Sequence, residues 1–335
     1  MRRNCMDFNG KTILITGGAG FIGSNLAFYF QENFPDAKVV VFDIFRTGET
    51  FSNGNLKSFG HYKNLKGFTG EIISGDITKK EDLERLRDFK FDYIFHEAAI
   101  SDTTVYDQKI MIDTNLNAFK DLLKMAKEMG SAMVYASSGA TYGNAPAPQT
   151  VGCEDPANIY GFSKLAMDHL AYDWMKKTDL PIVGLRYFNV YGPREFFKNK
   201  TASMVLQFGH QILSGKSPRL FEGSDKILRD FIYIDDVIQA NIKACNPKKS
   251  GVYNVGTGKA RSFQDIVDIL QKELGTNLPC EYIPNPYVGQ YQFFTQADIE
   301  PTREFLGYEP EVTLEEGIRR YLPEIKRLFK EEVNA

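Results

Sequence analysis

Tyr160 and Lys164 are spaced for proton transfer. Residues four apart on a helix lie on one face, one turn from each other, and residues 165–172 have a helical pattern. A free phenol titrates near pH ~10 and is therefore a poor base at neutral pH. A nearby ammonium and a positively charged cofactor ring favour the phenolate, so we expect the pKa of Tyr160 to be lowered. Alone the signal is weak, because a surface tyrosine beside a solvated lysine has the same spacing.

A glycine-rich turn between a strand and a helix predicts a dinucleotide site. A β-branched run at 11–16 indicates a buried parallel strand, and a helical pattern covers 24–31. Between them lies the motif that we expect to contact the cofactor, made of Gly17, Gly18, Ala19, Gly20, Phe21, Ile22 and Gly23. Glycines permit the tight turn and the close approach of a pyrophosphate, which the helix N-terminus then binds. The strand before and the helix after make a plain glycine turn the weaker interpretation.

Two charged residues follow the second predicted strand, at 38–42. Asp43 ends this strand, where an acid bonds the adenosine ribose hydroxyls of NAD, and Arg46 is suited to the extra phosphate of NADP. These two residues leave the choice of cofactor between NADP and NAD open. The loop at 47–70 either covers the cofactor or is a surface excursion.

A third acid, Asp76, follows the strand predicted at 71–74. It is suited to bond the adenine amino group, or alternatively to cap the helix predicted around 81–87. The first of these roles is favoured.

The elements that position these residues alternate along the chain. Strands are predicted at 11–16, 38–42, 71–74, 91–96, 132–136 and 182–186, with helices between them. The pattern predicts an α/β fold of Rossmann type, a doubly wound parallel sheet with a smaller C-terminal substrate-binding lobe built from non-contiguous segments. We expect an NAD(P)-binding domain at 11–185, completed by segments near 230–258, and a mainly substrate-binding lobe at 186–330. The pattern loosens after 186, and Ser262 to Asp265 form a capping box that opens a helix.

Composition excludes several classes of protein. The 335 residues carry a formal net charge of -3, which gives no reason to expect nucleic acid or an anionic membrane as a partner. No apolar run approaches the ~20 residues that span a bilayer. Four scattered cysteines have no spacing for zinc or a redox pair, and no metal site is predicted. A reduced, cytoplasmic location is the simplest expectation.

The chain resembles the extended short-chain dehydrogenase/reductase family, and within it the ADP-glyceromanno-heptose 6-epimerases of lipopolysaccharide biosynthesis. The glycine turn, the acidic strand end, Ser138, Tyr160 and Lys164 occur in the family's order. The most specific stretches lie at 186–195, 220–224, 229–231 and 291–298. The resemblance implies an enzyme that inverts carbon six of an ADP-heptose with bound NAD(P), and a homo-oligomer.

The resemblance also implies roles for individual residues. Tyr160 exchanges a proton at the carbon-six hydroxyl, Lys164 supports it and holds the nicotinamide ribose, and Ser138 bonds the reacting oxygen. Lys198 falls where the group has a second acid/base, although Lys200 is an alternative. Positions that match cofactor contacts are Glu97, Ala98, Ala99, Ser101, Asn115, Lys164 and Val190. Positions that match substrate contacts are Ser138, Asn189, Lys198, Lys200, Gln207, Phe221, Glu222, Gly223, Ser224, Arg229 and Tyr291.

Departures from the group and competing functions remain. At the positions of Ile44 and Thr50 the relatives have other side chains, which favour NADP, so these two residues weaken the assignment of NADP. Lys200 and Gln207 replace residues at substrate positions of the relatives, so the nucleotide base or sugar of the substrate stays open. A 4-epimerase of UDP- or GDP-sugars shares the main catalytic residues but needs no second base. A 4,6-dehydratase needs an Asp-Glu pair where this chain has Gly139-Ala140. A non-catalytic NAD(P)-binding regulator is disfavoured because Tyr160 and Lys164 are both intact.

Overall fold

The computed structural model describes residues 6–285 and 293–333. Seven parallel strands form the central sheet in the order β10-β6-β5-β4-β1-β2-β3. Their bounds are β1 Thr12–Thr16, β2 Lys38–Asp43, β3 Glu71–Ser74, β4 Tyr93–His96, β5 Ala132–Ser138, β6 Ile182–Tyr187 and β10 Gly251–Val255. The strand order reverses between β1 and β4, and such a reversal opens a crevice at the carboxyl ends of the strands. The predicted Rossmann-type, doubly wound sheet is confirmed.

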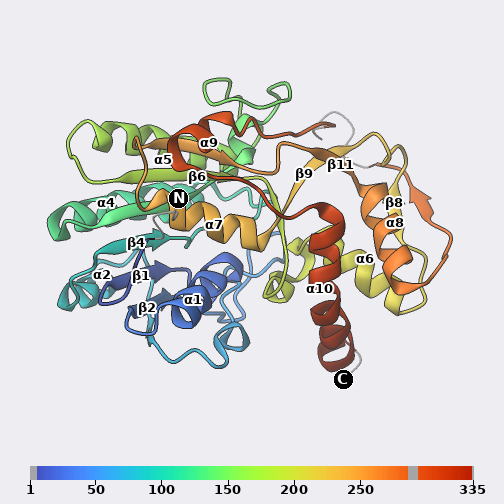
Figure 1. Ribbon diagram of the computed structural model, residues 1–335, viewed down its shortest axis with the longest axis horizontal. Helices are drawn as coiled ribbons and strands as arrows, with labels where there is room; N and C mark the ends of the chain where they lie inside the picture. The colour runs from blue at the N-terminus through green and yellow to red at the C-terminus, as the bar shows by residue number, and fades with distance from the viewer. Residues whose placement is uncertain (1–5, 286–292, 334–335) are drawn as a thin grey trace, which may run out of the picture.

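Helices cover both faces of this sheet (Figure 1). They are α1 Phe21–Asn33, α2 Lys80–Glu84, α3 Gln108–Ile112, α4 Ala118–Met129, α5 Ile159–Met175 and α7 Ile234–Ala244, with a π-helical turn at Asp113–Asn117. Successive strand residues point to opposite faces, so Ile13 joins the core beneath α1 and α7 while Leu14 joins the core beneath α4 and α5. Both faces are therefore apolar, which explains the continuous β-branched runs in the sequence.

A smaller lobe follows the sixth strand and lies to the right in Figure 1. Its sheets are β11-β9-β7 and β12-β8, and α6, α8 and α10 pack together. The bounds are β7 Asn189–Tyr191, β8 Arg219–Phe221, β9 Leu228–Tyr233, β11 Ala260–Ser262, β12 Glu281–Ile283, α6 Met204–Leu213, α8 Phe263–Leu274, α9 Glu300–Leu306 and α10 Leu314–Leu328. Short 3-10 segments are Tyr62–Leu65, Arg85–Asp88, Gly139–Tyr142 and Phe196–Thr201, and Phe329–Val333 is π-helical. Since β10 returns to the central sheet, the lobes interleave, and the domain boundaries stay a prediction.

Two sequence signals of the smaller lobe have clear outcomes. The capping box is present, because Ser262 accepts a hydrogen bond from the Asp265 amide (3.0 Å) and the Asp265 carboxylate accepts one from the Ser262 amide (2.9 Å). After 186, where the sequence pattern loosens, regular structure continues, because residues 189–191 form β7, which pairs with β9. In the described part of the chain, no helix combines the length and apolarity needed to cross a bilayer.

Candidate active site

The glycine turn is shaped as a phosphate cradle. Gly17 has φ +69°, and a Cβ there would lie 2.7 Å from the Ala98 nitrogen. A Cβ on Gly23 would lie 2.3 Å from the Gly17 carbonyl oxygen. Helix α1 begins next to the turn with Gly20 as its N-cap, which has no side chain to occupy the first amide groups. The backbone is thus arranged to bind an anion, as the motif predicted.

Asp43 lies at the end of β2 on the wall of a large cavity, of about 970 Å³. Its carboxylate accepts hydrogen bonds from the amides of Ala19 (2.9 Å) and Phe45 (2.7 Å). Burial raises its pKa, and these two bonds oppose the rise. The exposed Ile44 lines the cavity beside it.

Of the two other residues predicted to contact the adenosine, Asp76 lies on the cavity wall and Arg46 does not. Asp76 lines the cavity, where its carboxylate accepts hydrogen bonds of 2.8 Å from the amide and hydroxyl of Thr78. It does not cap α2, whose N-cap is Lys79, because the chain turns at Thr78 before the helix begins. Arg46 is absent from the cavity wall: its guanidinium donates to the Phe197 carbonyl and lies 5.8 Å from the Phe197 ring centroid.

The residues present fit a nicotinamide dinucleotide. One cavity extends from the glycine turn, past the ends of β2 and β4, to Tyr160 and Lys164 on α5. The loop after β2 contributes to its wall through residues 56–60, so this loop covers the cavity rather than being a surface excursion. Among the described residues, no group of three or more acidic, histidine or cysteine side chains is arranged to hold a metal ion.

Tyr160 and Lys164 lie on the cavity wall as the helical spacing predicts. Asn158 fixes the start of α5 by accepting a hydrogen bond from the Gly161 amide (2.8 Å). The Lys164 ammonium donates to the Ala136 carbonyl at 2.6 Å. Burial lowers the pKa of Lys164 to about 8, opposed by Glu97 and Asp168.

The pKa of Tyr160 differs from the sequence expectation. Burial raises it, and a hydrogen bond with Ser138 opposes the rise. The expected lowering of this pKa by Lys164 is not found: burial has the larger effect, Glu97 adds to it, and the Lys164 ammonium donates to the Ala136 carbonyl at the end of β5.

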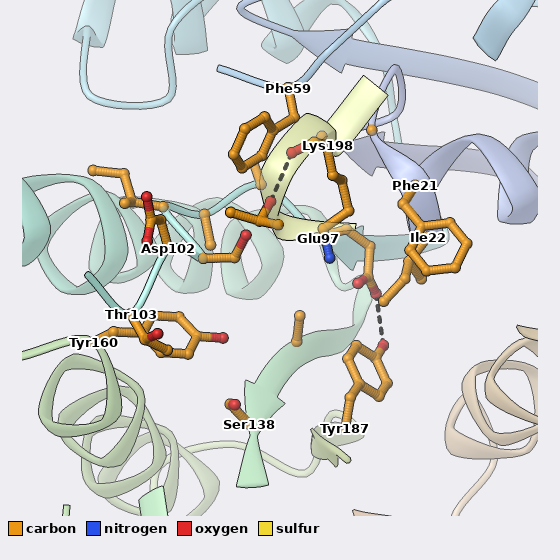
Figure 2. Close-up of a pocket in the computed structure, with 18 of the residues that line it drawn as sticks. Phe21, Ile22, Phe59, Glu97, Asp102, Thr103, Ser138, Tyr160, Tyr187 and Lys198 are labelled. Atoms are coloured by element: carbon orange, nitrogen blue, oxygen red, sulfur yellow. Dashed lines mark hydrogen bonds between the residues drawn. The ribbon is translucent and has the colours of Figure 1, made fainter. Parts of the chain in front are cut away.

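Glu97 adds a half-buried acid to this wall. The Tyr187 hydroxyl donates to its Oε1 at 2.9 Å (Figure 2). Burial raises its pKa to about 7, while Tyr187 and Lys164 oppose the rise. Neighbouring His96 points away into the core, where Nδ1 lies 2.8 Å from the Thr16 hydroxyl and burial lowers its pKa to about 3.

A buried ion network holds the elements under Ser138 and Tyr160. Arg186 on β6 is 1% exposed and pairs with Asp168 on α5 (2.8 Å) and with Glu154. Asp168 also accepts hydrogen bonds from the hydroxyls of Tyr135 (2.8 Å) and Ser137 (3.0 Å) on β5. One carboxylate therefore ties β6 to the strand β5 that carries Ser138 and to the helix α5 that carries Tyr160 and Lys164. Sequence reasoning had not identified this network.

Lys198 lines the cavity, whereas the exposed Lys200 does not. Figure 2 shows Lys198 entering from the segment that lies across the cavity from Ser138 and Tyr160. Its Nζ lies 5.7 Å from the ring centroid of Phe21. Burial lowers its pKa, and the carboxylate of Glu195 opposes this.

The remaining predicted residues fall into three groups. The cavity wall includes Gly17, Gly20, Phe21, Ile22, Gly23, Ala98, Ala99, Ser101, Ser138, Asn189, Val190 and Arg229. Outside it lie Asn115, Gln207, Phe221, Glu222, Gly223 and Ser224. Asn115 instead bonds the amide and carbonyl of Ile100 (2.9 and 3.0 Å), and Gln207 bonds the carbonyls of Lys200 and Ala202. Tyr291 lies outside the described residues.

Several wall residues were not identified as site residues from the sequence, among them Tyr187, Ser203, Phe231, Phe263 and Thr295. Thr295 is 7% exposed, and its hydroxyl has no hydrogen-bond partner among the described residues. Thr295 lies at 291–298, one of the stretches most specific to the family that the chain resembles, and this was the sequence signal that could have identified it. Tyr187 and Phe231 lie in the specific stretches at 186–195 and 229–231, so the same signal was available for them. Spacing gave no sign of Ser203 and Phe263, because they come from separate elements of the smaller lobe.

Three solved structures similar to this chain are sugar-nucleotide epimerases by their names. ADP-L-glycero-D-manno-heptose-6-epimerase from Helicobacter pylori is 53% identical, with TM-score 0.88 over 95% of this chain and 97% of that one. UDP-glucose 4-epimerase from Thermotoga maritima is 28% identical, with TM-score 0.83 over 94% and 99%. UDP-glucuronic acid 4-epimerase from Bacillus cereus, in complex with UDP-glucuronic acid and NAD, is 29% identical, with TM-score 0.80 over 95% and 99%.

A family model agrees with these similarities. It matches residues 13–256, from the first strand of the central sheet through its last, and so spans the glycine turn, Ser138, Tyr160 and Lys198. The matched region is most of the chain. The chain therefore belongs to the NAD dependent epimerase/dehydratase family.

Proposed function

We propose that the protein is an ADP-glyceromanno-heptose 6-epimerase that interconverts ADP-D-glycero-D-manno-heptose and ADP-L-glycero-D-manno-heptose. The observation that carries the proposal is Lys198, a second acid–base group on the cavity wall across from Tyr160. The 53% identity to the Helicobacter pylori 6-epimerase supports it. The product would supply heptose for the lipopolysaccharide core, and we expect a cytoplasmic homo-oligomer.

Tyr160 and Ser138 handle the proton in one epimer. A bound nicotinamide dinucleotide supplies the oxidation at carbon six and its reversal. Tyr160 accepts the hydroxyl proton as the secondary alcohol becomes a ketone, and Ser138 hydrogen-bonds the same oxygen. The ammonium of Lys164 stabilises the phenolate form of Tyr160. The carboxylates of Glu97 and Asp168 help to keep Lys164 protonated.

Lys198 completes the inversion. When the ketone group at carbon six rotates about its bond to the ring, its oxygen turns away from Tyr160. The group that returns a proton must then stand on the other side of the cavity. Lys198 stands there, and its burial lowers its pKa toward working pH, which suits a proton donor. A 4-epimerase rotates the whole keto-sugar and needs no such group.

The diphosphate is assigned to Arg229. Its side chain is 7% exposed and lies on the cavity wall, with its guanidinium 6.0 Å from the Phe263 ring centroid. A guanidinium held in this way offers paired donors to phosphate oxygens. Asn189 on the same wall is assigned to the substrate as well.

For the cofactor, the arrangement favours NAD. Asp43 presents a carboxylate at the ribose end, and Ile44 beside it has no group for an additional phosphate. NADP requires Arg46 to leave the Phe197 carbonyl. The NAD complex of the Bacillus cereus relative supports this choice.

Proton NMR of the purified protein with ADP-D-glycero-D-manno-heptose tests the proposal. Signals of the L-glycero epimer, appearing without added cofactor, are expected, because a recycled cofactor need not dissociate between turnovers. If the heptose stays unchanged with NAD and NADP both supplied, the proposal is wrong. UDP- and GDP-sugars would then be tested for 4-epimerisation.

A further inference from the structure

The short segment Phe196–Thr201 that carries Lys198 is not a regular helix. Asn199 within it has φ 52° and ψ -122°, which breaks the 3-10 geometry, and Arg194 just before it has φ 76°. Non-glycine residues in this region of backbone space are strained, and they persist only where the surroundings fix them. The position of Lys198 therefore depends on contacts made by its neighbours.

Glu195 fixes the two ends of this segment. Its fully buried carboxylate accepts hydrogen bonds from the Gly192 amide (3.2 Å) and from the amide and hydroxyl of Ser203 (2.6 and 2.7 Å). Its carbonyl accepts from the Lys198 amide at 2.9 Å. The Thr201 hydroxyl closes the turn by donating to the Lys198 carbonyl at 2.8 Å. These bonds hold the backbone of the segment, including the amide and carbonyl of Lys198, but none of them contacts the side chain of Phe197.

The middle of the segment is held by the loop that follows β2. The ring of Phe197 stacks on His61 with centroids 3.7 Å apart and planes at 1°. The backbone carbonyl of Phe197 accepts a hydrogen bond from the Arg46 guanidinium. The loop itself is closed, because the Arg46 amide donates to the Gly60 carbonyl (2.9 Å) and the His61 amide donates to the Ala19 carbonyl in the glycine turn (3.1 Å).

The position of Lys198 is thus held through the contacts of its neighbour in the chain, Phe197. Phe197 is 9% exposed and faces the loop, while Lys198 faces the cavity. Because adjacent residues share a peptide plane, holding the carbonyl of Phe197 also holds the amide and the Cα of Lys198, from which its side chain leaves the backbone. The same loop reaches the ribose end of the cavity through Asp43, which bonds the Ala19 amide.

We propose that His61 and Arg46 are positioning residues: by clamping Phe197 they hold the amine of Lys198 at the carbon-six oxygen. The inference rests on the proposed function, in which Lys198 is the second acid–base group. It adds that the loop at the adenosine end of the cavity sets the geometry of a proton transfer at its other end. A shift of about 1 Å in a reacting group can cost about 10²-fold in rate.

The test compares His61→Ala with His61→Phe. Both variants lose the hydrogen bond from the Lys63 amide to His61 Nδ1 (3.1 Å), but only His61→Ala loses the ring stack. We expect His61→Ala to lower kcat by up to about 10²-fold, with KM for the ADP-heptose unchanged, and His61→Phe to restore most of kcat. Equal kcat in His61→Ala and wild type, or an equal loss in both variants, would overturn the proposal.

A measurement without substrate separates this inference from the proposed function. Limited acetylation followed by fragmentation mass spectrometry gives the ratio of modified Lys198 to modified Lys200 in each protein. The ratio is expected to be low in wild type and His61→Phe, and to rise in His61→Ala as Lys198 is released. An unchanged ratio contradicts the clamp, even if wild type proves inactive on ADP-heptose. If His61→Ala does not fold, Phe197→Leu paired with Phe197→Tyr takes its place in both measurements.

Discussion

The Tyr187 hydroxyl donates a hydrogen bond of 2.9 Å to Oε1 of Glu97, on the wall of the cavity that holds Tyr160 and Lys164. The bond partly offsets the burial of the Glu97 carboxyl, whose pKa is about 7. Near neutral pH this acid is therefore divided between its two protonation states. Its charge also opposes the loss of a proton from Lys164.

Glu97→Gln is expected to change the pH dependence of stability. The folded pKa of about 7 lies above the ordinary glutamate pKa of 4.5, so the protonated carboxyl's contribution is complete below 4.5 and is lost as pH rises through 7. The Glu97 side chain is only partly buried, and solvent in the cavity screens its charge. The free-energy cost of ionising it in the folded state is therefore at most about 3 kcal/mol. The variant should be more stable than wild type at pH 8, and the two curves should converge near pH 4. Urea unfolding across this pH range measures the difference.

Tyr160→Phe is expected to remove most of the epimerase activity. The change deletes the hydroxyl that exchanges the substrate proton and leaves the buried ring in place, so the fold should be retained. Loss of a general acid–base group typically costs about 10²- to 10⁴-fold. The initial rate of epimer formation by NMR measures the loss. A rate within a few-fold of wild type would assign the chemistry to another residue.

Lys198→Met and Lys200→Met form a matched pair two residues apart. Lys198 lines the cavity and Lys200 is exposed outside it, so only the first change removes the proposed second acid–base group. We expect Lys198→Met to lose about 10²-fold or more in kcat, and Lys200→Met far less. The opposite ranking would move the second acid–base role to Lys200 and imply that the segment rearranges when substrate binds.

Arg186→Met should destabilise the fold strongly. It leaves the carboxylates of Asp168 and Glu154 without their cation, and unpairing a buried ion pair costs about 3–5 kcal/mol. Arg219→Met is the control, because its pair with Glu281 is more than half exposed on both sides and such pairs contribute about 0–1 kcal/mol. Urea midpoints of the two variants give the comparison. Similar midpoints would show that the buried network is dispensable for stability.

Asp43→Asn is expected to reduce the preference for NAD over NADP. The amide oxygen still accepts one backbone hydrogen bond, while the negative charge that repels a ribose phosphate is removed. Calorimetric titration of cofactor-stripped protein with each dinucleotide gives the two dissociation constants. Tighter binding of NADP than NAD by wild type would contradict the assignment of NAD.

The sequence by itself determined the sheet, the cradle and the catalytic helix, because each is encoded locally. The β-branched runs are buried on both faces of a parallel sheet, the glycines satisfy backbone contacts within one turn, and the i,i+4 spacing puts Tyr160 and Lys164 on one face. Acidic and small residues at strand ends were located for the same reason, since parallel strands bring their carboxyl ends to one edge.

Only the tertiary structure decided which side chains meet across the cavity. Lys198 and Lys200 are indistinguishable by spacing, and the kink at Asn199 directs one inward and the other to solvent. Arg46 was suited to a phosphate by its position in the sequence. In the structure its guanidinium donates instead to the backbone carbonyl of Phe197, whose ring stacks on His61. These contacts join residues more than a hundred positions apart, where packing of separate elements sets the geometry and local sequence preference does not.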